Sequence, residues 1–428
     1  QCFFDLPEKK IISIVRNFID NKKELNIEYE GKYYSFPKNV IVKNKTEMVR
    51  DYKPENFVIE VEDLDYESSR LYSPVDALYV VNTNCITDCI YCYANKSYNY
   101  SPITFENLSA IIKEAREIGM RNIDISGGEL FLSENWDKIV FELLDNGFKP
   151  YISTKVPIGK RQIQKLKDIG ITEIQISIDS MNQDVLSRIL NVDRNYHSRI
   201  IETLKKLDAE GFVIKTNTII TNLNSSKKGI TELLEFLASL KNIRHINLSP
   251  VGYSIYKTDF ELFKPKVEDL KKISELVEKI KRGRNIFGID FNPYLSSELV
   301  NGEFRIKDQY FAKRAKCTGN IENFIILPDG KVTICEELYW HPAFIIGDLT
   351  KQTIMEVWNS DKALSLQKLS QNKIQEKSAC KSCNDFKSCR NMPGVCWKFI
   401  IEAYGAENWD FPDPRCPLAP KPETAFCY

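Results

Sequence analysis

Three cysteines lie close together in the segment CITDCIYC, at Cys85, Cys89 and Cys92. A thiolate is a strong ligand for transition metals, but a structural zinc site needs four ligands and this segment supplies only three. An iron–sulfur cube that is held by three thiolates leaves one iron open for another ligand. The segment therefore favours an iron–sulfur cluster with an open iron over a complete zinc site.

A second group of cysteines lies near the end of the chain. No cysteine occurs between Cys92 and Cys317, and after that gap come Cys317, Cys335, Cys380, Cys383, Cys389, Cys396, Cys416 and Cys427. The cytosol keeps thiols reduced, and a loop-rich segment with this many cysteines is typical of a small domain that folds around metal. Four thiolates that include a C-x2-C pair also fit a zinc ribbon, which stays open as an alternative.

The segments between the two cysteine groups must position them. Short β-branched runs alternate there with amphipathic helical stretches, such as the helix expected over 104–119 with Thr104 as its N-cap. Alternation of this kind predicts a parallel sheet covered by helices, either doubly wound or a partial (β/α) barrel. The first cysteine loop follows the first strand, at the carboxyl edge where such folds place their sites. The expected strands are 76–83, 122–126, 149–154, 173–179, 213–221 and 245–250.

The pattern changes at both ends of this alternating region. Residues 1–70 are expected to form a small α+β unit with a helix at 8–21 and strands at 25–30, 32–36 and 56–63. Residues 71–310 would form the barrel and residues 311–428 the cysteine-rich domain. We therefore predict an α/β chain of three units.

Composition and charge limit the partners of the chain. With 59 basic and 59 acidic residues the chain has no net charge, so nothing indicates a nucleic-acid partner. No stretch is apolar enough to span a membrane, and the start of the sequence carries charges where a signal peptide would be apolar. We expect a cytoplasmic protein.

The first cysteine segment resembles the CxxxCxΦC loop of the radical S-adenosylmethionine (SAM) enzymes, with Tyr91 as the aromatic residue. The resemblance implies a partial (β/α)6 TIM-type barrel. It also implies a [4Fe–4S] cluster on Cys85, Cys89 and Cys92, whose open iron binds the amine and carboxylate of SAM and whose electron cleaves SAM to a 5′-deoxyadenosyl radical. In the family these three cysteines are catalytic.

Further motifs of that family can be matched along the barrel. The segment DISGGEL resembles the family's GGE motif, with Leu130 in place of the usual proline. The segment QISIDS resembles the contacts to the SAM ribose and carboxylate, because alternate residues of a strand point to one side. Arg199 competes with Arg188 for one of these roles. The resemblance thus implies SAM contacts by Gly127, Gly128, Glu129, Ser177, Asp179, Arg188 and Asn217.

The tail is similar to the SPASM extension of these enzymes, which carries two auxiliary [4Fe–4S] clusters. By that resemblance one cluster is held by Cys380, Cys383, Cys389 and Cys416, and the other by Cys317, Cys335 and Cys396. The spacing before Cys396 is x6 where the family has x3. The second set is one ligand short, so a substrate thiolate, Cys427 or Glu336 would complete it, and Cys2 is assigned to neither cluster.

The two resemblances imply a peptide maturase with three [4Fe–4S] clusters, SAM and a flavodoxin- or ferredoxin-type electron donor. We expect a monomer that binds the leader of a ribosomally made precursor peptide through residues 1–70 and forms a crosslink, foremost a cysteine thioether. A sulfatase-maturating type of dehydrogenase is one alternative, with Glu336 as the catalytic base. A peptide epimerase with Cys427 or Cys2 as the hydrogen donor is another. A non-catalytic iron–sulfur or zinc scaffold that binds a peptide is the alternative outside enzymes.

Overall fold

The computed structural model describes residues 24–29, 32–37 and 70–422, without 95, 97, 253, 257–259, 284–286, 294–316, 340 and 391–394. Strands β1 (Glu24–Tyr29) and β2 (Lys32–Pro37) form an antiparallel hairpin, in which Glu24 lies opposite Pro37. This hairpin confirms two of the predicted N-terminal strands. The helix expected at 8–21 and the strand expected at 56–63 lie outside the described residues.

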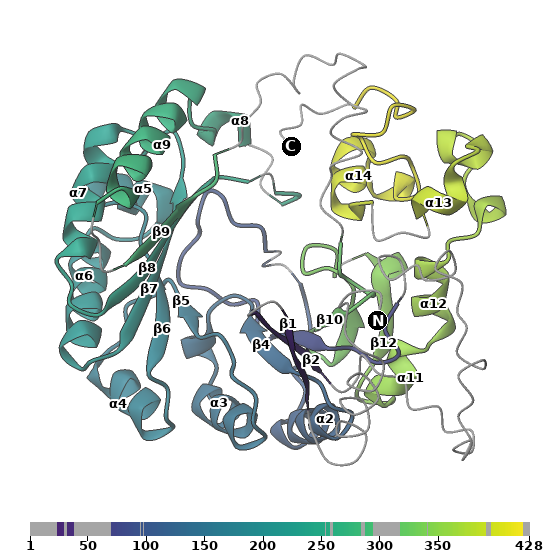
Figure 1. Ribbon diagram of the computed structural model, residues 1–428, viewed down its shortest axis with the longest axis horizontal. Helices are drawn as coiled ribbons and strands as arrows, with labels where there is room; N and C mark the ends of the chain where they lie inside the picture. Colours follow the sequence, from purple (N-terminus) through teal and green to yellow (C-terminus); the bar gives the residue numbers. More distant parts are fainter. Residues whose placement is uncertain are drawn as a thin grey trace.

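The strands of the barrel lie in two five-stranded sheets (Figure 1), and every pair formed between barrel strands is parallel. One sheet has the order β5-β6-β7-β8-β9, and the other has the order β12-β11-β10-β3-β4. All six predicted strands are confirmed, although β5 is shorter than expected. β9 was not predicted, because four residues are too few to show a period. The strands are β3 (Asp76–Val80), β4 (Asn122–Ser126), β5 (Ser153–Thr154), β6 (Glu173–Ser177), β7 (Val213–Ile220), β8 (Ile243–Pro250) and β9 (Gly288–Phe291).

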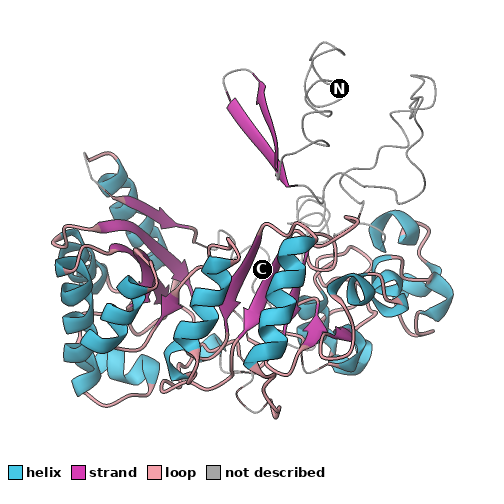
Figure 2. Cartoon of the chain, turned by 90° about the horizontal axis from the view of Figure 1, so that it is seen from below, coloured by secondary structure: helices cyan, strands magenta, loops and turns pink. Residues whose placement is uncertain are grey.

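Helices follow the strands and lie on the outer side of the curved sheets (Figures 1 and 2). Helix α2 shows why they form: the Thr104 side chain caps its start by accepting a hydrogen bond from the Asn107 N–H at 3.2 Å. Four residues at helical spacing, Leu108, Ile111, Ile112 and Ala115, are buried against the sheet. The predicted helix and its N-cap are confirmed. The helices are α2 (Phe105–Glu117), α3 (Trp136–Asp145), α4 (Lys160–Asp168), α5 (Gln183–Leu190), α6 (Asn195–Ala209), α7 (Lys227–Ala238), α8 (Phe260–Phe263) and α9 (Val267–Lys281).

The tail joins the barrel through a shared sheet. Strand β10 (Asn323–Ile326) pairs in parallel with β3, and β11 (Lys331–Thr333) and β12 (Ile345–Asp348) add antiparallel strands beyond it. Hydrogen bonding thus crosses the boundary that was expected at residue 310. The remaining tail helices are α11 (Ile354–Trp358), α12 (Asp361–Gln367), α13 (Phe386–Arg390) and α14 (Trp397–Tyr404).

The same junction is packed by side chains from both parts. Trp358 of α11 is fully buried, and the Arg70 guanidinium lies 3.7 Å from the centre of its ring. Arg70 also donates a hydrogen bond to the Asn320 carbonyl at 2.8 Å. The predicted α/β architecture, a partial barrel with a C-terminal extension, is therefore observed. Within the described part of the chain no helix has both the length and the apolar character to cross a membrane.

Candidate active site

A cavity of about 460 Å³ lies at the carboxyl edge of the barrel strands. Its wall is formed by the loops and strand ends after β3, β4, β5, β6, β7 and β8, and by residues of the tail. A cavity of this size suits a small-molecule ligand. The barrel and the tail therefore enclose one site together.

The thiols of Cys85, Cys89 and Cys92 all line this cavity. The Thr87 hydroxyl lies 3.1 Å from the Cys85 sulfur and 3.3 Å from the Cys89 sulfur, which holds the loop in a compact turn. The Cys92 N–H donates to the Cys89 carbonyl at 3.0 Å within the same turn. The sequence-predicted ligands are thus brought together on one wall. Three thiolates without a fourth protein ligand are the donor set that an iron–sulfur cube with an open iron requires.

The two glycines after β4 are required by close packing of the backbone. Gly127 has a φ of +129°, and a Cβ atom there would lie 2.3 Å from the Asn82 carbonyl oxygen. A Cβ atom on Gly128 would lie 2.0 Å from the Asn84 carbonyl oxygen. The family resemblance predicts that these glycines contact SAM. In the structure they allow a close approach to the chain segment that leads into Cys85.

Glu129 follows these glycines and lies in the cavity wall with only 3% of its surface exposed. The Thr154 hydroxyl donates to its carboxylate at 2.8 Å, and the Phe131 N–H donates to it at 3.2 Å. Burial raises the pKa of Glu129 to about 7, although these hydrogen bonds favour the charged form. In its charged form this carboxylate can accept a hydrogen bond from a cationic or hydrogen-donating group of a ligand.

The other expected SAM contacts divide into residues that line the cavity and residues that do not. Ser177 at the end of β6 and Asn217 on β7 line it. Arg188 is not among the lining residues, because it lies on α5. Arg199 on α6 is half exposed and pairs with Asp193 at 2.8 Å. Neither arginine is among the residues that line this cavity in the part of the chain that the structure describes, so a contact between Arg188 and the cofactor stays a prediction.

Asp179 lies fully buried behind the cavity wall and is held by its neighbours. Its carboxylate accepts hydrogen bonds from the Tyr91 hydroxyl at 2.5 Å, the Lys155 ammonium at 3.2 Å and the Ile219 N–H at 2.9 Å. Tyr91 and Lys155 both line the cavity. Asp179 therefore fixes the cluster loop against the ends of β5, β6 and β7, and it is not itself a lining residue.

Lys155 is a cation in the cavity wall that the sequence analysis missed. Its ammonium lies 2.6 Å from the Tyr91 hydroxyl and 5.1 Å from the centre of the Tyr91 ring. Lys155 directly follows β5. Its position at the carboxyl end of a parallel strand could therefore have identified it as a candidate site residue. The strand at 149–154 was predicted, but no family motif singles out the lysine that follows it.

Glu336, from the tail, lines the same cavity. Its carboxylate accepts a hydrogen bond from the Tyr93 hydroxyl at 3.3 Å and lies 3.5 Å from the Ser126 hydroxyl. Burial raises the pKa of Glu336. The carboxylate that follows Cys335 in the sequence thus faces the space beside the cluster loop.

Two further charges enter the cavity from the tail and were not predicted. The Lys398 ammonium lies 2.6 Å from the Glu337 carboxylate and 3.6 Å from that of Glu402. Burial opposes the charged form of Lys398, but the two carboxylates outweigh it and raise the pKa of Lys398. Burial raises the pKa of Glu402 to about 7. The cavity therefore has a charged, partly buried wall on its tail side.

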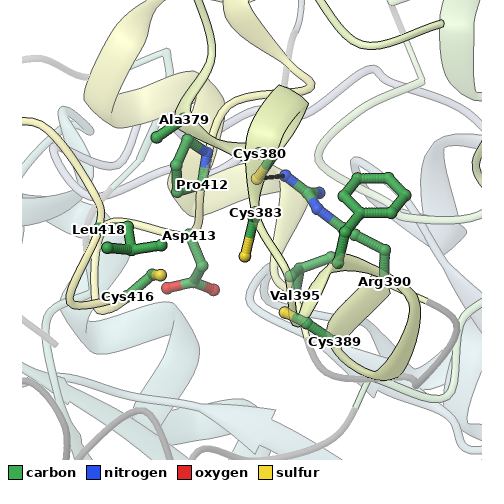
Figure 3. A pocket seen from close by; sticks show the side chains of 11 residues that line it. Ala379, Cys380, Cys383, Cys389, Arg390, Val395, Pro412, Asp413, Cys416 and Leu418 are labelled. Atoms are coloured by element: carbon green, nitrogen blue, oxygen red, sulfur yellow. Dashed lines mark hydrogen bonds between the residues drawn. The ribbon is translucent and has the colours of Figure 1, made fainter. Parts of the chain in front are cut away.

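The outer cysteine group of the tail surrounds a smaller cavity of its own. Figure 3 shows the four sulfur atoms around a common space, and all four predicted residues line it. Two come from the segment before α13, one from α13 itself and one from the segment after α14. Four thiols that converge in this way fit a four-iron cube. The residues are Cys380, Cys383, Cys389 and Cys416.

The inner group consists of Cys317, Cys335 and Cys396. Burial chiefly raises the pKa of Cys335, and the neighbouring charges of Cys396 and Cys317 raise it further. The electrostatic effect places Cys396 and Cys317 in the neighbourhood of Cys335. Cys2 and Cys427 lie outside the described residues, and the ten described cysteines form no disulfide.

Comparison with known families places two models on the chain. The model of the radical SAM superfamily matches residues 79–237. The model of the SPASM iron–sulfur cluster-binding domain matches residues 317–384. The first match includes all three cysteines of the first loop. The second match includes Cys317, Cys335, Cys380 and Cys383 of the tail.

Individual relatives match more of the chain. The PqqA peptide cyclase of Bradyrhizobium diazoefficiens is 24% identical over 373 residues, which cover 82% of this chain and 88% of that protein. The GTP 3′,8-cyclase of Sulfurimonas denitrificans is 30% identical over 172 residues, but the match covers only 38% of this chain and about half (52%) of that enzyme.

Solved structures show the same fold. The crystal structure of Streptococcus suis SuiB bound to its precursor peptide SuiA has a TM-score of 0.59 at 18% identity and covers 82% of this chain and 77% of that chain. The structure of anSMEcpe with bound AdoMet has a TM-score of 0.51 at 17% identity and covers 76% of this chain and 90% of that chain.

Proposed function

Because this chain is a radical SAM enzyme with a C-terminal SPASM domain, we propose that it is a maturase of a ribosomally made precursor peptide. The observation that carries the proposal is the shared cavity: thiols of the first cysteine loop and charged side chains of the tail line one space. A substrate in that cavity would contact both parts. The likeness to a PqqA peptide cyclase and to SuiB, whose structure includes a precursor peptide, supports a peptide as the substrate.

The residues of the cavity fit the cofactors of the family. We assign the first cluster to Cys85, Cys89 and Cys92, since their thiols alone supply three ligands on one wall. When bound, the cluster and SAM supply a 5′-deoxyadenosyl radical that removes a hydrogen atom from the substrate. We assign Glu129 to the amino group of SAM, because its buried carboxylate gains most from a hydrogen-donating partner.

Other lining residues complete the proposed SAM site. Ser177 and Asn217 lie where they can donate and accept hydrogen bonds to the sugar and the amino-acid part. Gly127 and Gly128 hold Glu129 and the cluster loop in contact. Tyr91 is the aromatic wall, held in place by Lys155 and Asp179. In this assignment Asp179 positions Tyr91 and does not touch the cofactor.

The tail cysteines are assigned to two auxiliary clusters, so that the protein carries three [4Fe–4S] clusters. The outer one would use Cys380, Cys383, Cys389 and Cys416, and the inner one Cys317, Cys335 and Cys396. Two of the inner ligands are close in sequence to residues that line the cavity: Cys335 is followed by Glu336, and Cys396 lies two residues before Lys398. An electron that leaves the substrate would therefore have a short path to the tail.

The reaction we favour is formation of a cysteine thioether. When a substrate carbon is joined to a substrate thiol, the carbon loses one hydrogen atom. The thiol loses one proton, and the carbon–sulfur centre that forms loses one electron. The bound SAM cofactor would accept the hydrogen atom, an auxiliary cluster would accept the electron, and a base would accept the proton. The inner cysteine set, with three described ligands, would leave an iron open for the substrate thiolate.

Dehydrogenation of the sulfatase-maturating type is the second candidate, and one observation favours it. The Glu336 carboxylate faces the cavity beside Tyr93 and Ser126, where it can accept a proton from a substrate carbon or hydroxyl. Both reactions need a base on the tail side of the cavity. They differ in whether the substrate residue is joined to a sulfur.

We further propose a monomeric cytoplasmic enzyme that receives electrons from a flavodoxin- or ferredoxin-type donor and binds the peptide leader through residues 1–70. The hairpin of β1 and β2 supports the last point, because an extended peptide can add a strand to the edge of a hairpin.

The experiment combines protein reconstituted without air, SAM, a chemical reductant and a precursor peptide encoded beside the gene. A maturase would form 5′-deoxyadenosine and a peptide that is lighter by two hydrogen atoms. A thioether would also remove one thiol from alkylation, whereas dehydrogenation would create a carbonyl that hydrazide reagents trap. An unchanged mass with a changed α-carbon configuration would indicate the epimerase. Failure to form 5′-deoxyadenosine would leave only the scaffold and would contradict the proposal.

A further inference from the structure

The outer cysteine group contains a buried cation that the proposed function does not use. Arg390 is the last residue of α13 and directly follows Cys389. Its side chain is only 4% exposed and lines the cavity formed by the four thiols. In Figure 3 its guanidinium group points toward Cys380.

The hydrogen bonds of Arg390 use only part of its donor capacity. Its Nη2 donates to the Cys380 sulfur at 3.3 Å and to the carbonyls of Asp410, at 3.1 Å, and Phe411. Its Nε and Nη1 have no hydrogen-bond partner among the residues that the structure describes. A guanidinium group has five N–H donors, so the unused ones are available to further sulfur acceptors.

The charge of Arg390 also lacks a carboxylate partner within the described part of the chain. Asp413, which lines the same cavity, pairs with Arg415 at 2.7 Å. A buried charge is costly unless an opposite charge compensates it. The four thiols line the same cavity as Arg390, and they become negatively charged when they bind iron. They are therefore the opposite charge that can compensate the guanidinium group.

We propose that Arg390 sets the reduction potential of the outer auxiliary cluster by stabilising its reduced form. The inference rests on the proposed assignment of that cluster to Cys380, Cys383, Cys389 and Cys416. Reduction adds one electron, and the added negative charge is shared by the sulfur ligands. A buried cation and N–H···S hydrogen bonds favour the more negative state, so they raise the potential. The electron comes from the substrate side in turnover and from the titrant in the experiment below.

This role makes Arg390 a positioning and tuning residue for electron transfer, not a catalytic one. Because its hydrogen bonds to Asp410 and Phe411 also hold the segment before Cys416, a purely structural role is the rival explanation. A reduction potential separates the two roles, because a structural role changes how much cluster is bound but not the potential of the clusters that remain.

The test is an anaerobic redox titration of cluster-loaded Arg390→Gln and Arg390→Lys, followed by electron paramagnetic resonance. The couple of the outer cluster is identified as the one missing from a Cys380→Ala/Cys383→Ala variant. Lys381→Gln is the matched control: it removes a positive charge beside Cys380, but this ammonium donates to the carbonyls of Asn372 at 2.9 Å and Ile374 at 3.0 Å.

We expect Arg390→Gln to lower the ratio of reduced to oxidised outer cluster at a fixed potential by at least about tenfold, which is about 59 mV for a one-electron couple. Arg390→Lys keeps the charge and should shift the same couple by less, while Lys381→Gln should leave it unchanged. An unchanged couple in Arg390→Gln at full iron content would overturn the proposal. Loss of about four irons from both Arg390 variants would overturn it as well, since the role would then be structural. Failure of the cluster assignment would show separately, as a wild-type protein without a third cluster.

Discussion

Lowering the pH from 8 to 6 should weaken the binding of SAM to the cluster-loaded protein by about tenfold through Glu129 alone. Burial raises the pKa of this carboxyl group from the usual 4.5 to about 7. A group with this pKa is about 90% charged at pH 8 and about 10% charged at pH 6. The charged form accepts the stronger hydrogen bond from the amino group of SAM, and it is lost as the pH falls through 7.

The assay compares the dissociation constant of SAM at the two pH values in wild-type protein and in Glu129→Gln, under nitrogen. The SAM amino group titrates in the same range, but its effect is common to both proteins and cancels in the comparison. At pH 8 the variant should bind about tenfold or more weakly, as expected for a lost hydrogen bond to a charged group. Glu202→Gln, on the exposed face of α6, is the control and should behave as the wild type. An equal pH dependence in wild type and Glu129→Gln would refute the assignment of Glu129.

The burial of Glu129 also affects the stability of the folded protein. The charged form, which favours SAM binding, disfavours folding. Because the folded protein holds the Glu129 proton more tightly than the unfolded chain does, folding becomes less favourable as the pH rises from about 4.5 toward 7. Without SAM, Glu129→Gln should therefore raise the free energy of unfolding by about 1 kcal/mol at pH 5 and about 3 kcal/mol at pH 8. Denaturant titrations at the two pH values measure it, and an advantage that shrinks with rising pH would contradict the argument.

Four further outcomes are expected. Replacing Cys85, Cys89 and Cys92 with Ala should lower the iron content from about twelve to about eight per chain and abolish 5′-deoxyadenosine; cleavage that persists would disprove the cluster assignment. Gly128→Ala should destabilise the fold by about 1–3 kcal/mol or more in thermal denaturation, since its Cβ would lie 2.0 Å from the Asn84 carbonyl oxygen. Lys155→Met leaves the fully buried Asp179 without its cation and should cost about 3–5 kcal/mol, whereas Lys228→Met on the exposed face of α7 should cost little. Removing residues 1–69, which keeps Arg70 on Trp358, should spare SAM cleavage but weaken binding of a labelled leader in fluorescence anisotropy; equal binding would show that this unit has another role.

The residues that the sequence could place are those whose neighbours are local. The cysteine loop and the GGE motif each follow a strand with a clear β-branched run, so their position at the carboxyl edge could be predicted. The helix at 104–119 could be predicted as well, because its N-cap residue is next to it in sequence and its buried residues recur at helical spacing.

The residues that escaped prediction depend on contacts between distant parts of the chain. Glu337 and Lys398 lie 61 residues apart, and they enter the cavity only because the tail folds onto the barrel. Arg188 lies in the last turn of α5, is exposed and is not among the residues that line the cavity. The pairing of β10 with β3 likewise joins segments separated by more than two hundred residues, for which no periodicity gives a signal.

That pairing has a consequence for how the chain can be divided. A sheet edge presents a row of unpaired N–H and C=O groups that invites association with other chains. In this protein β10 occupies the edge of β3 and carries β11 and β12 with it, so the tail protects the first barrel strand. A chain cut at the start of the tail would expose that edge, and Arg70 would lose the ring of Trp358 on which it lies. The barrel without its cysteine-rich extension should therefore associate through β3, the strand that leads into the cluster loop.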